Sequence, residues 1–429
     1  MPVLRAALGL LFFCVVAWLM SSHKRKVPVR VVVWGLALQL GLAWALLRTE
    51  TGQNVFNEVA GFVTKLVSMA APGAGMVFGP LADPAAMDAV FGEGRGFIFG
   101  FAGTGLVVII FFSALMSLLY HLGVMQVVIW CVAKVMSAFM GVSGAESMAM
   151  AANIFVGQTE APLVVKPYIA GMTNSELNAM MTGGFATIAG SVLAVYMGIL
   201  GPEYAPHLLT ASVLSAPAAF LIAKIMLPET EVSATGGKVE LRIERTAHNV
   251  IEAAANGTSD GLALWLNVMA MLIAFVALIT LVDWPLGYIG EHWLGIEGFG
   301  LQRIFGWVFA PVAWIMGVDG WHDCQVFGGL LGTKIAVNEF VAFTHLHEAV
   351  PGAMANVSPE RVFESARSAK MAAYALCGFA NFSSIGIQIG GISPLAPSRK
   401  TDLSRLAFRA MLGGAFASWM TATVAGMFL

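Results

Sequence analysis

Residues 157–162 place an amide, a hydroxyl and a carboxylate side by side within one of the most apolar stretches of the sequence. The run reads Gly-Gln-Thr-Glu-Ala-Pro, and its polar side chains are Gln158, Thr159 and Glu160. A charge at membrane depth costs at least about 2.5 kcal/mol, so such residues usually face a cavity and take part in function. The glycine and the proline also interrupt helices and expose backbone groups at the same point. The run therefore predicts a solute-binding site.

The composition of the 429-residue chain is that of a polytopic membrane protein. Only 11% of its residues are charged, 58% are hydrophobic and the mean hydropathy is +0.80, whereas a soluble protein carries about 25% charged residues. The net charge of −2 lacks the basic surplus that binding to phosphate backbones requires, so no nucleic acid partner is expected. We expect one integrated all-α domain within a lipid bilayer.

About 20 consecutive apolar residues cross the hydrocarbon core of a bilayer as a helix. By this criterion the sequence predicts eight transmembrane helices, at residues 4–20, 29–48, 96–120, 174–200, 205–227, 260–282, 371–393 and 406–428. Amphipathic or aromatic-rich stretches at residues 52–71, 124–141 and 283–307 predict helices that lie in the membrane interface.

Two further apolar stretches, at about residues 143–172 and 309–344, carry glycines and polar residues near their middle. Such stretches predict re-entrant hairpins, which enter and leave the membrane on the same side. A hairpin of this kind is tolerated only where its turn faces protein or a water-filled cavity.

Basic residues orient the predicted helices. Eight of the 23 lysines and arginines lie in the two short loops at residues 21–30 and 395–409. Because short cytoplasmic loops carry an excess of basic residues, we expect both loops in the cytoplasm. With the two hairpins counted as re-entrant, both chain termini are then outside.

Two segments that start 194 residues apart indicate an internal duplication. Gly184–Ser191 and Gly378–Ile385 both begin with Gly-Phe-Ala and are rich in small and hydroxylated residues. Each follows a predicted hairpin that carries a carboxylate, Glu160 in the first and Glu339 in the second. Three identical residues alone are compatible with chance, but the matching carboxylates and the opposed orientations favour inverted repeats.

Inverted repeats with broken helices are the plan of many secondary transporters, which hold their solute near the membrane midplane. On this plan the chain has three regions. They are N-terminal scaffold helices at residues 1–95, a first repeat at 96–258 with its broken helix at about 174–200, and a second repeat at 259–429 with its broken helix at about 371–393.

With these motifs the chain resembles the concentrative nucleoside transporters over about residues 30–429. The matching motifs are Asn153–Pro162, Gly184–Ser191, Asn249–Gly257, Asn338–Ala342 and Gly378–Gly386. The chain departs from the family at Asp319, where many members carry proline. The resemblance implies a cation-coupled symporter that imports nucleosides such as uridine by alternating access. It also implies a homotrimer, surrounded by lipid, in the bacterial cytoplasmic (inner) membrane.

The polar residues match the two parts of a nucleoside. An amide both donates and accepts and reads the edge of a base, and an ionised carboxylate makes charge-assisted hydrogen bonds with vicinal hydroxyls. The resemblance implies nucleobase contacts from Gln158, Thr159, Glu160 and Val192, and ribose contacts from Glu339, Asn381 and Ser384 with Phe379 as an apolar wall.

Structural alternatives stay open for these polar residues. Asn381 and Ser384 are also suited to capping a helix at the broken span. The two hairpin carboxylates are also suited to structural ion pairs, with Lys166 or Lys334 as partners. Glu146 is expected to cap the first helix of the first hairpin or to pair locally.

The resemblance to sodium-coupled members implies a sodium site where the first hairpin meets the broken helix. Its ligands are the side chain of Asn153, the carbonyl of Val156, the hydroxyl of Thr187 and the carbonyl of Ile188. Free carbonyls at unwound helix ends commonly form such ion sites. Sodium is expected to bind first and to order the hairpin tip. A proton-coupled symporter is the alternative.

An intramembrane enzyme that uses Glu160 and Glu339 as acid and base is the alternative from another class. It would need a nucleophile or a metal cluster beside them, and neither an H-E-x-x-H pattern nor a histidine cluster occurs within the predicted spans. His322 is expected to begin the second hairpin rather than to bind a metal.

Overall fold

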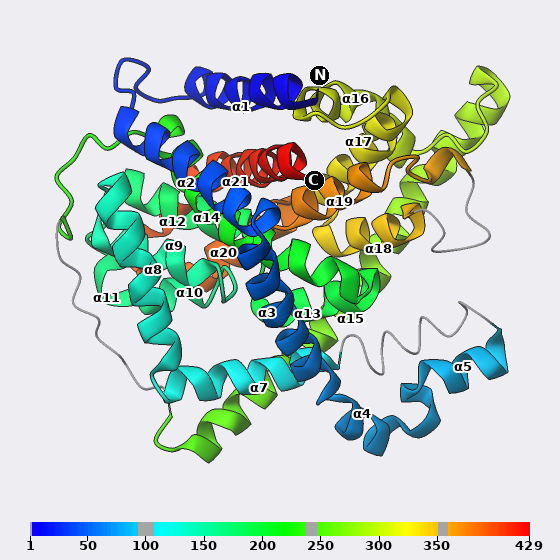
Figure 1. The fold of residues 1–429 in the computed structure, drawn as a ribbon, viewed down its shortest axis with the longest axis horizontal. Helices are drawn as coiled ribbons and strands as arrows, with labels where there is room; N and C mark the ends of the chain where they lie inside the picture. The colour runs from blue at the N-terminus through cyan, green and yellow to red at the C-terminus, as the bar shows by residue number, and fades with distance from the viewer. Residues whose placement is uncertain (1, 93–106, 237–246, 351–358) are drawn as a thin grey trace.

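A computed structural model describes residues 2–92, 107–236, 247–350 and 359–429. Within these ranges the protein consists of helices and contains no β-strand (Figure 1). The α-helices are α1 (Pro2–Leu19), α2 (Val29–Arg48), α3 (Glu50–Ser68), α4 (Ala71–Phe78), α5 (Pro84–Phe91), α7 (Val108–His121), α8 (Val124–Met140), α9 (Gly144–Asn153), α10 (Ala161–Val164), α11 (Lys166–Ile169), α12 (Asn174–Ala186), α13 (Gly190–Leu200), α14 (Ala205–Met226), α15 (Val250–Ile289), α16 (Leu301–Met316), α17 (Trp321–Ala336), α18 (Glu339–Ala349), α19 (Ala366–Leu376), α20 (Phe382–Ile392) and α21 (Lys400–Phe428). A π-helical turn, η4 (Gly290–Leu294), extends α15, and 3₁₀ turns lie at Gly79–Ala82, Pro202–Tyr204, Pro359–Arg361 and Pro397–Arg399.

Side-chain caps determine where several helices begin. Ser143 and Glu146 form a capping box at the start of α9, and Thr173 and Glu176 form another at the start of α12. An asparagine takes the capping position before α15, α18 and α20. These side chains accept from backbone N–H groups that have no partner within the helix. The helix starts are therefore encoded locally, and the expected capping role of Glu146 is confirmed.

Several helices have the length and composition of membrane spans. Among the described residues, six helical segments are each long and apolar enough to cross a membrane: Val29–Arg48, Glu50–Met87, Asn174–Leu200, Ala205–Met226, Val250–Leu294 and Pro397–Phe428. Two helix pairs qualify only together, and they are bent by 78° between α7 and α8 and by 113° between α16 and α17. The prediction of an all-α polytopic membrane protein with broken helices is confirmed.

The centre of the molecule is formed by α12, α14 and α21, with α1, α2 and α19 packed around them (Figure 1). Gly414 lets α21 approach α12 closely, because a Cβ there would lie 2.4 Å from the Cβ of Phe185. Two contacts place α1 antiparallel to α21: Gly9 lies against Thr423, and a hydrogen bond joins Arg409 to Ser22. Both chain termini therefore lie at the same end of the bundle.

The two predicted broken helices are confirmed, and their breaks lie in the repeated segments. Residues 187–189 separate α12 from α13, and residues 377–381 separate α19 from α20. The first hairpin is formed by α9, α10 and α11, with its turn at residues 154–160. The second hairpin is formed by α17 and α18, with its turn at residues 337–338.

The second hairpin begins later than the predicted residue 309. Residues 309–316 belong to α16, which is bent sharply away from α17. Gly317 and Gly320, with φ of 94° and 60°, lie in the connection between the two helices. The apolar composition of α16 gives no sign of this break. The interfacial position of residues 283–307 stays a prediction, and α15 continues from the predicted span without a break to Ile289.

Other expectations on the scaffold stay predictions. The boundary between residues 95 and 96 and the start of the span 96–120 lie outside the described residues. The run Glu50–Met87 is long and apolar enough to cross a membrane, so length does not distinguish a spanning position of α3 from the interfacial position predicted for residues 52–71.

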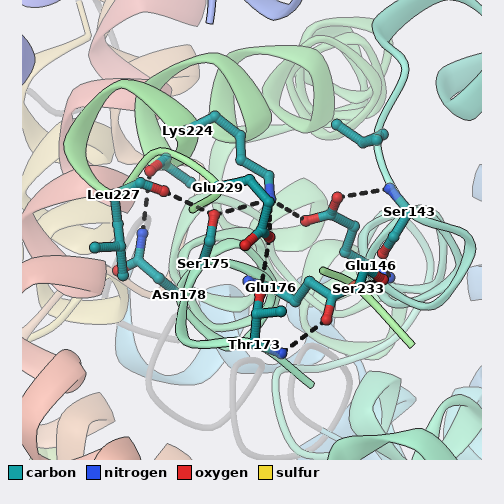
Figure 2. A network of polar contacts seen from close by, with 12 residues as sticks. Ser143, Glu146, Thr173, Ser175, Glu176, Asn178, Lys224, Leu227, Glu229 and Ser233 are labelled. Carbon is teal, nitrogen blue, oxygen red and sulfur yellow. Dashed lines mark hydrogen bonds and ion pairs between the residues drawn. The ribbon is translucent and has the colours of Figure 1, made fainter. Parts of the chain in front are cut away.

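A buried polar network holds the base of the first hairpin (Figure 2). The ammonium of Lys224 in α14 lies 2.7 Å from a carboxylate oxygen of Glu146 in α9 and donates to Ser175 Oγ in α12 at 2.9 Å. Glu229, which follows α14, lies 3.6 Å from the same ammonium and accepts from Thr173 Oγ1 at 2.8 Å. The network joins three helices at the end of the hairpin opposite its turn, and the local pairing expected of Glu146 is confirmed.

We expect Lys224→Met to lower the thermal unfolding midpoint of the detergent-purified protein, because it leaves the buried Glu146 carboxylate without its nearest cation. Breaking a buried ion pair from one side costs about 3–5 kcal/mol. The double variant Lys224→Met/Glu146→Gln removes both charges and should recover part of the loss. A single variant as stable as the wild type would contradict this role of the pair.

Candidate functional site

Glu339 is a buried carboxylate that is held by neutral donors. It begins α18 directly after the capping residue Asn338, and its residue surface is only 7% exposed. Tyr196 of α13 donates its hydroxyl to Glu339 Oε1 at 3.0 Å, and Asn381 Nδ2 donates to Oε2 at 2.8 Å. One donor comes from each broken helix, so Glu339 lies where the two repeats meet.

Asn381 both caps a helix and binds the carboxylate. Its Oδ1 accepts from the backbone N–H of Ser384 at 2.8 Å and from Ser383 Oγ at 2.7 Å, which caps α20. The capping interpretation is therefore confirmed for Asn381, whose NH₂ group remains available for Glu339. Ser384 lies in the first turn of α20 and is buried.

Neither Glu160 nor Glu339 forms an ion pair among the described residues. Lys334 donates instead to the carbonyl of Ala375 at 2.8 Å and to Ser418 Oγ at 2.9 Å. The ion-pair alternative with Lys334 or Lys166 is wrong for this conformation. Glu339 therefore keeps its accepting capacity for a further donor.

The two helix breaks contact one another. The backbone N–H of Phe379 donates to the carbonyl of Thr187 at 3.3 Å. Gly378, with φ of 151°, lies so close that a Cβ would be 2.9 Å from the carbonyl oxygen of Ala186. Unwound backbone at this depth is tolerated only where protein or water satisfies it, and here each break partly satisfies the other.

The tip of the first hairpin contacts α20. Gln158 is buried, and its Oε1 accepts from Gln388 Nε2 at 3.1 Å. Thr159 packs on Gly391, where a Cβ would lie 2.6 Å from its methyl carbon. Glu160 differs from its neighbours, because the residue is exposed and its carboxylate folds back beside Gly157.

The remaining predicted contact residues line the same region. Val192 is buried in the first turn of α13, one turn before Tyr196. Phe379 is half-buried in the break before α20. Asn381, which caps α20, contacts Glu339 of the second hairpin, and Gln388 on the same helix contacts Gln158 of the first. One short helix and its cap therefore contact both hairpin tips.

The predicted sodium ligands meet at the first hairpin and the first break. The backbone N–H of Gly190 donates to the carbonyl of Phe155 at 3.0 Å and joins these two segments. Asn153 is 1% exposed, and neither atom of its amide has a partner among the described residues. Thr187 donates its hydroxyl to the carbonyl of Gly183 at 2.9 Å, which leaves its oxygen free to accept.

Two backbone carbonyls complete this oxygen set. No hydrogen bond within the described part of the chain reaches the carbonyl of Val156 or that of Ile188. Four neutral oxygens of this kind suit a hard cation and not a transition metal. The described residues also contain no group of three or more His, Cys, Asp or Glu side chains placed to hold a metal.

Sequence reasoning missed Tyr196 and Gln388. Both are polar residues within predicted spans, and polar residues in apolar sequence were also the signal that predicted the site at residues 157–162. Tyr196 also falls four residues after Val192, which places it on the same helix face. His322 was placed correctly in the first turn of α17, where its Nε2 lies 3.0 Å from the carbonyl of Val362.

The fold and this site define a secondary transporter, in which two hairpin tips and two interrupted helices meet around a polar centre. Residues 207–426 match the family model described as the C-terminus of Na+ dependent nucleoside transporters, and residues 8–81 match the N-terminal model. Residues 104–203 match a model described as nucleoside recognition. The chain belongs to the Na+ dependent nucleoside transporter family, the concentrative nucleoside transporters.

Individual relatives agree over nearly the whole chain. An uncharacterized transporter of Haemophilus influenzae is 43% identical over 429 residues, covering 100% of this chain and 98% of that protein. Sodium/nucleoside cotransporter 1 of Rattus norvegicus is 40% identical over 424 residues, covering 98% of this chain and 63% of that protein. The structure of CNTnw in an inward-facing substrate-bound state has a TM-score of 0.91 at 39% identity and covers 100% of this chain and 98% of that chain.

These findings place the chain, a multi-pass membrane protein, among the sodium-dependent nucleoside transporters. The intramembrane enzyme alternative is wrong, because the family and its named members are transporters. Outward-facing and intermediate states of CNTnw also match this chain, with TM-scores of 0.90 and 0.91. The family therefore works through alternating access.

We expect Tyr196→Phe to raise the half-saturating nucleoside concentration of uptake about tenfold. The change removes the donor to Glu339 Oε1 and leaves a buried carboxylate oxygen unsatisfied, which costs about 1–3 kcal/mol. Nucleoside uptake into proteoliposomes at a fixed sodium gradient measures the effect. Tyr374→Phe is the matched control, because that buried hydroxyl contacts His207 instead. An equal effect of both changes would contradict the assignment.

Proposed function

We propose that this chain is a symporter that imports nucleosides such as uridine together with sodium. The observation that carries the proposal is the buried Glu339 carboxylate, whose side-chain donors within the described ranges are both neutral, Tyr196 and Asn381. A carboxylate without a cationic partner in an apolar interior is strongly disfavoured unless further donors complete it. The vicinal hydroxyls of a ribose are donors of this kind.

The ribose is proposed to bind at Glu339, Asn381 and Ser384. In this proposal Glu339 accepts from two ribose hydroxyls. Its position supports this role, because it lies at the start of α18, beside the capped start of α20. The half-buried ring of Phe379 offers an apolar wall next to these polar groups.

The nucleobase is proposed to bind at the first hairpin tip. Gln158 offers an amide and Thr159 a hydroxyl, and Val192 offers an apolar surface on α13. Glu160, whose side chain is exposed beside Gly157, is proposed to reach the base from the solvent side. Two sets of contacts on opposite hairpins would bind the two parts of one nucleoside.

Sodium is proposed to bind between the first hairpin and the break in the following helix. The buried amide of Asn153 has no partner among the described residues, and the carbonyls of Val156 and Ile188 accept no hydrogen bond there. With the hydroxyl oxygen of Thr187, these groups form a neutral oxygen set. Sodium bound at Val156 would order the residues that lead directly to Gln158.

Coupling between sodium binding and nucleoside binding follows from the proximity of Val156 to Gln158. A cation that orders the hairpin tip raises the affinity for the base, and the bound nucleoside must raise the affinity for the cation by the same factor. The proposed order of events is sodium first, then nucleoside, then movement of the two hairpins relative to the scaffold.

The assembly is proposed to be a homotrimer in the bacterial inner membrane, with both termini outside. The basic loops at residues 21–30 and 395–409 support this orientation, and both termini lie at one end of the bundle. Exposed apolar residues such as Ile273 and Leu281, on α15, offer a surface for lipid and for neighbouring protomers.

We expect an inward sodium gradient to drive uridine accumulation in proteoliposomes. Thr187→Val removes a proposed ligand oxygen and preserves the side-chain shape, so the half-saturating sodium concentration should rise about tenfold or more. Thr210→Val is the matched control, because that buried hydroxyl makes the same type of bond to the carbonyl four residues earlier, Pro206, at 2.7 Å. Equal uptake with and without sodium, combined with a response to pH, would favour proton coupling instead.

We expect Glu339→Gln to abolish most uridine uptake. Hydrogen bonds to a charged group contribute about 1.5–3 kcal/mol each, so losing even one corresponds to about a 10- to 150-fold weaker apparent affinity. Thermal unfolding in detergent establishes whether the variant is folded, and Glu231→Gln, an exposed carboxylate, is the control. Near-normal uptake by a folded Glu339→Gln variant would remove Glu339 from the ribose site.

A further inference from the structure

Gln388 is a buried amide on α20 that neither the proposed nucleoside site nor the proposed sodium site includes. Its residue surface is 0% exposed. Its Nε2 donates to Gln158 Oε1 at 3.1 Å and to the backbone carbonyl of Met181 at 3.0 Å. The two amides belong to opposite repeats, so Gln388 connects the second repeat to the tip of the first hairpin.

The carbonyl of Met181 determines which way the Gln388 amide points. A backbone carbonyl only accepts, so the end of Gln388 that faces it must be the NH₂ group. A flipped Gln388 would place its oxygen against Met181 O and Gln158 Oε1, which are both acceptors. The present arrangement costs less, since it leaves one atom of the Gln388 amide, Oε1, buried without a partner in the described part of the chain.

Gln388 in turn determines which way the Gln158 amide points. Because Gln388 presents a donor, Gln158 must turn its oxygen toward it. The NH₂ group of Gln158 has no acceptor among the described residues and is left for the solute. Gly184 makes the close approach of the two amides possible: a Cβ there would lie 2.7 Å from Gln388 Nε2 and 2.9 Å from Gln158 Cβ.

We infer that Gln388 is a specificity-determining residue that holds Gln158 as a hydrogen-bond donor toward the nucleobase. The inference rests on the proposed function, in which Gln158 contacts the base. A fixed donor selects bases that present an acceptor, such as a ring carbonyl, and disfavours bases that present an amino group at the same position. Uridine and cytidine differ in this way, because the ring carbonyl of one is replaced by an amino group in the other.

Two substitutions at Gln388 should change the orientation of the Gln158 amide in different ways. Gln388→Met preserves the length of the side chain and removes the donor, so the Gln158 amide turns freely. Gln388→Glu replaces the donor by a carboxyl group. Whether that group is ionised or donates its proton to Met181 O, it presents an acceptor to Gln158. Gln158 then turns its NH₂ group inward and presents its oxygen to the solute.

The test is competitive uptake of uridine and cytidine into proteoliposomes under a sodium gradient. We expect the wild type to prefer uridine by about tenfold or more, Gln388→Met to reduce the preference to within about threefold, and Gln388→Glu to favour cytidine. Gln39→Met is the matched control, because that buried amide donates to Leu214 O and Thr421 Oγ1 outside the site. It should keep the wild-type ratio.

The ratio of uridine to cytidine uptake distinguishes a change in specificity from a folding defect. A transporter that is only destabilised loses uptake of both nucleosides together. An unchanged ratio in Gln388→Met, or a wild type that prefers cytidine, would overturn the inference. In either case sodium-driven uptake of nucleosides would still support the proposed function. If the wild type itself shows no sodium-driven nucleoside uptake, that result would instead overturn the proposed function.

Discussion

The chain is unwound twice within its apolar interior, and each break supplies hydrogen-bonding groups that the other needs. Backbone N–H and C=O groups cannot be left unpaired away from water. The contact from Phe379 N–H to the carbonyl of Thr187 satisfies one group from each break, and Gly378 permits it, because a Cβ there would lie 2.9 Å from the carbonyl of Ala186. The broken helices must therefore cross at their breaks, and polar side chains gather at that crossing.

The crossing also explains why each hairpin tip is held by the opposite repeat. Tyr196 of the first repeat donates to Glu339 of the second, and Gln388 of the second donates to Gln158 of the first. Neither tip can move without changing a contact to the other repeat. A solute bound at this point touches both repeats at once, which is the arrangement that alternating access requires.

The sequence predicted the elements whose signals are local and missed the contacts that join distant segments. Polar motifs within apolar spans located both breaks and Glu339. The start of the second hairpin was placed too early, because the apolar composition of α16 hides the turn at Gly317. Tyr196 and Gln388 were missed because their partners are 143 and 230 residues away. The exposed position of Glu160 depends on how its carboxylate folds back on Gly157, which no spacing rule determines.

The first hairpin is held by interactions of different strength at its two ends. At its base, Lys224 and Glu146 form a buried ion pair at 2.7 Å, and breaking such a pair from one side costs about 3–5 kcal/mol. At its tip, Gln158 accepts a neutral hydrogen bond from Gln388, and such bonds contribute about 1 kcal/mol each. Displacing the tip therefore costs less than displacing the base. Since Gln158 lies in the tip and Asn153 ends the helix directly before it, sodium and nucleoside would both act on the part of the hairpin that is easiest to move.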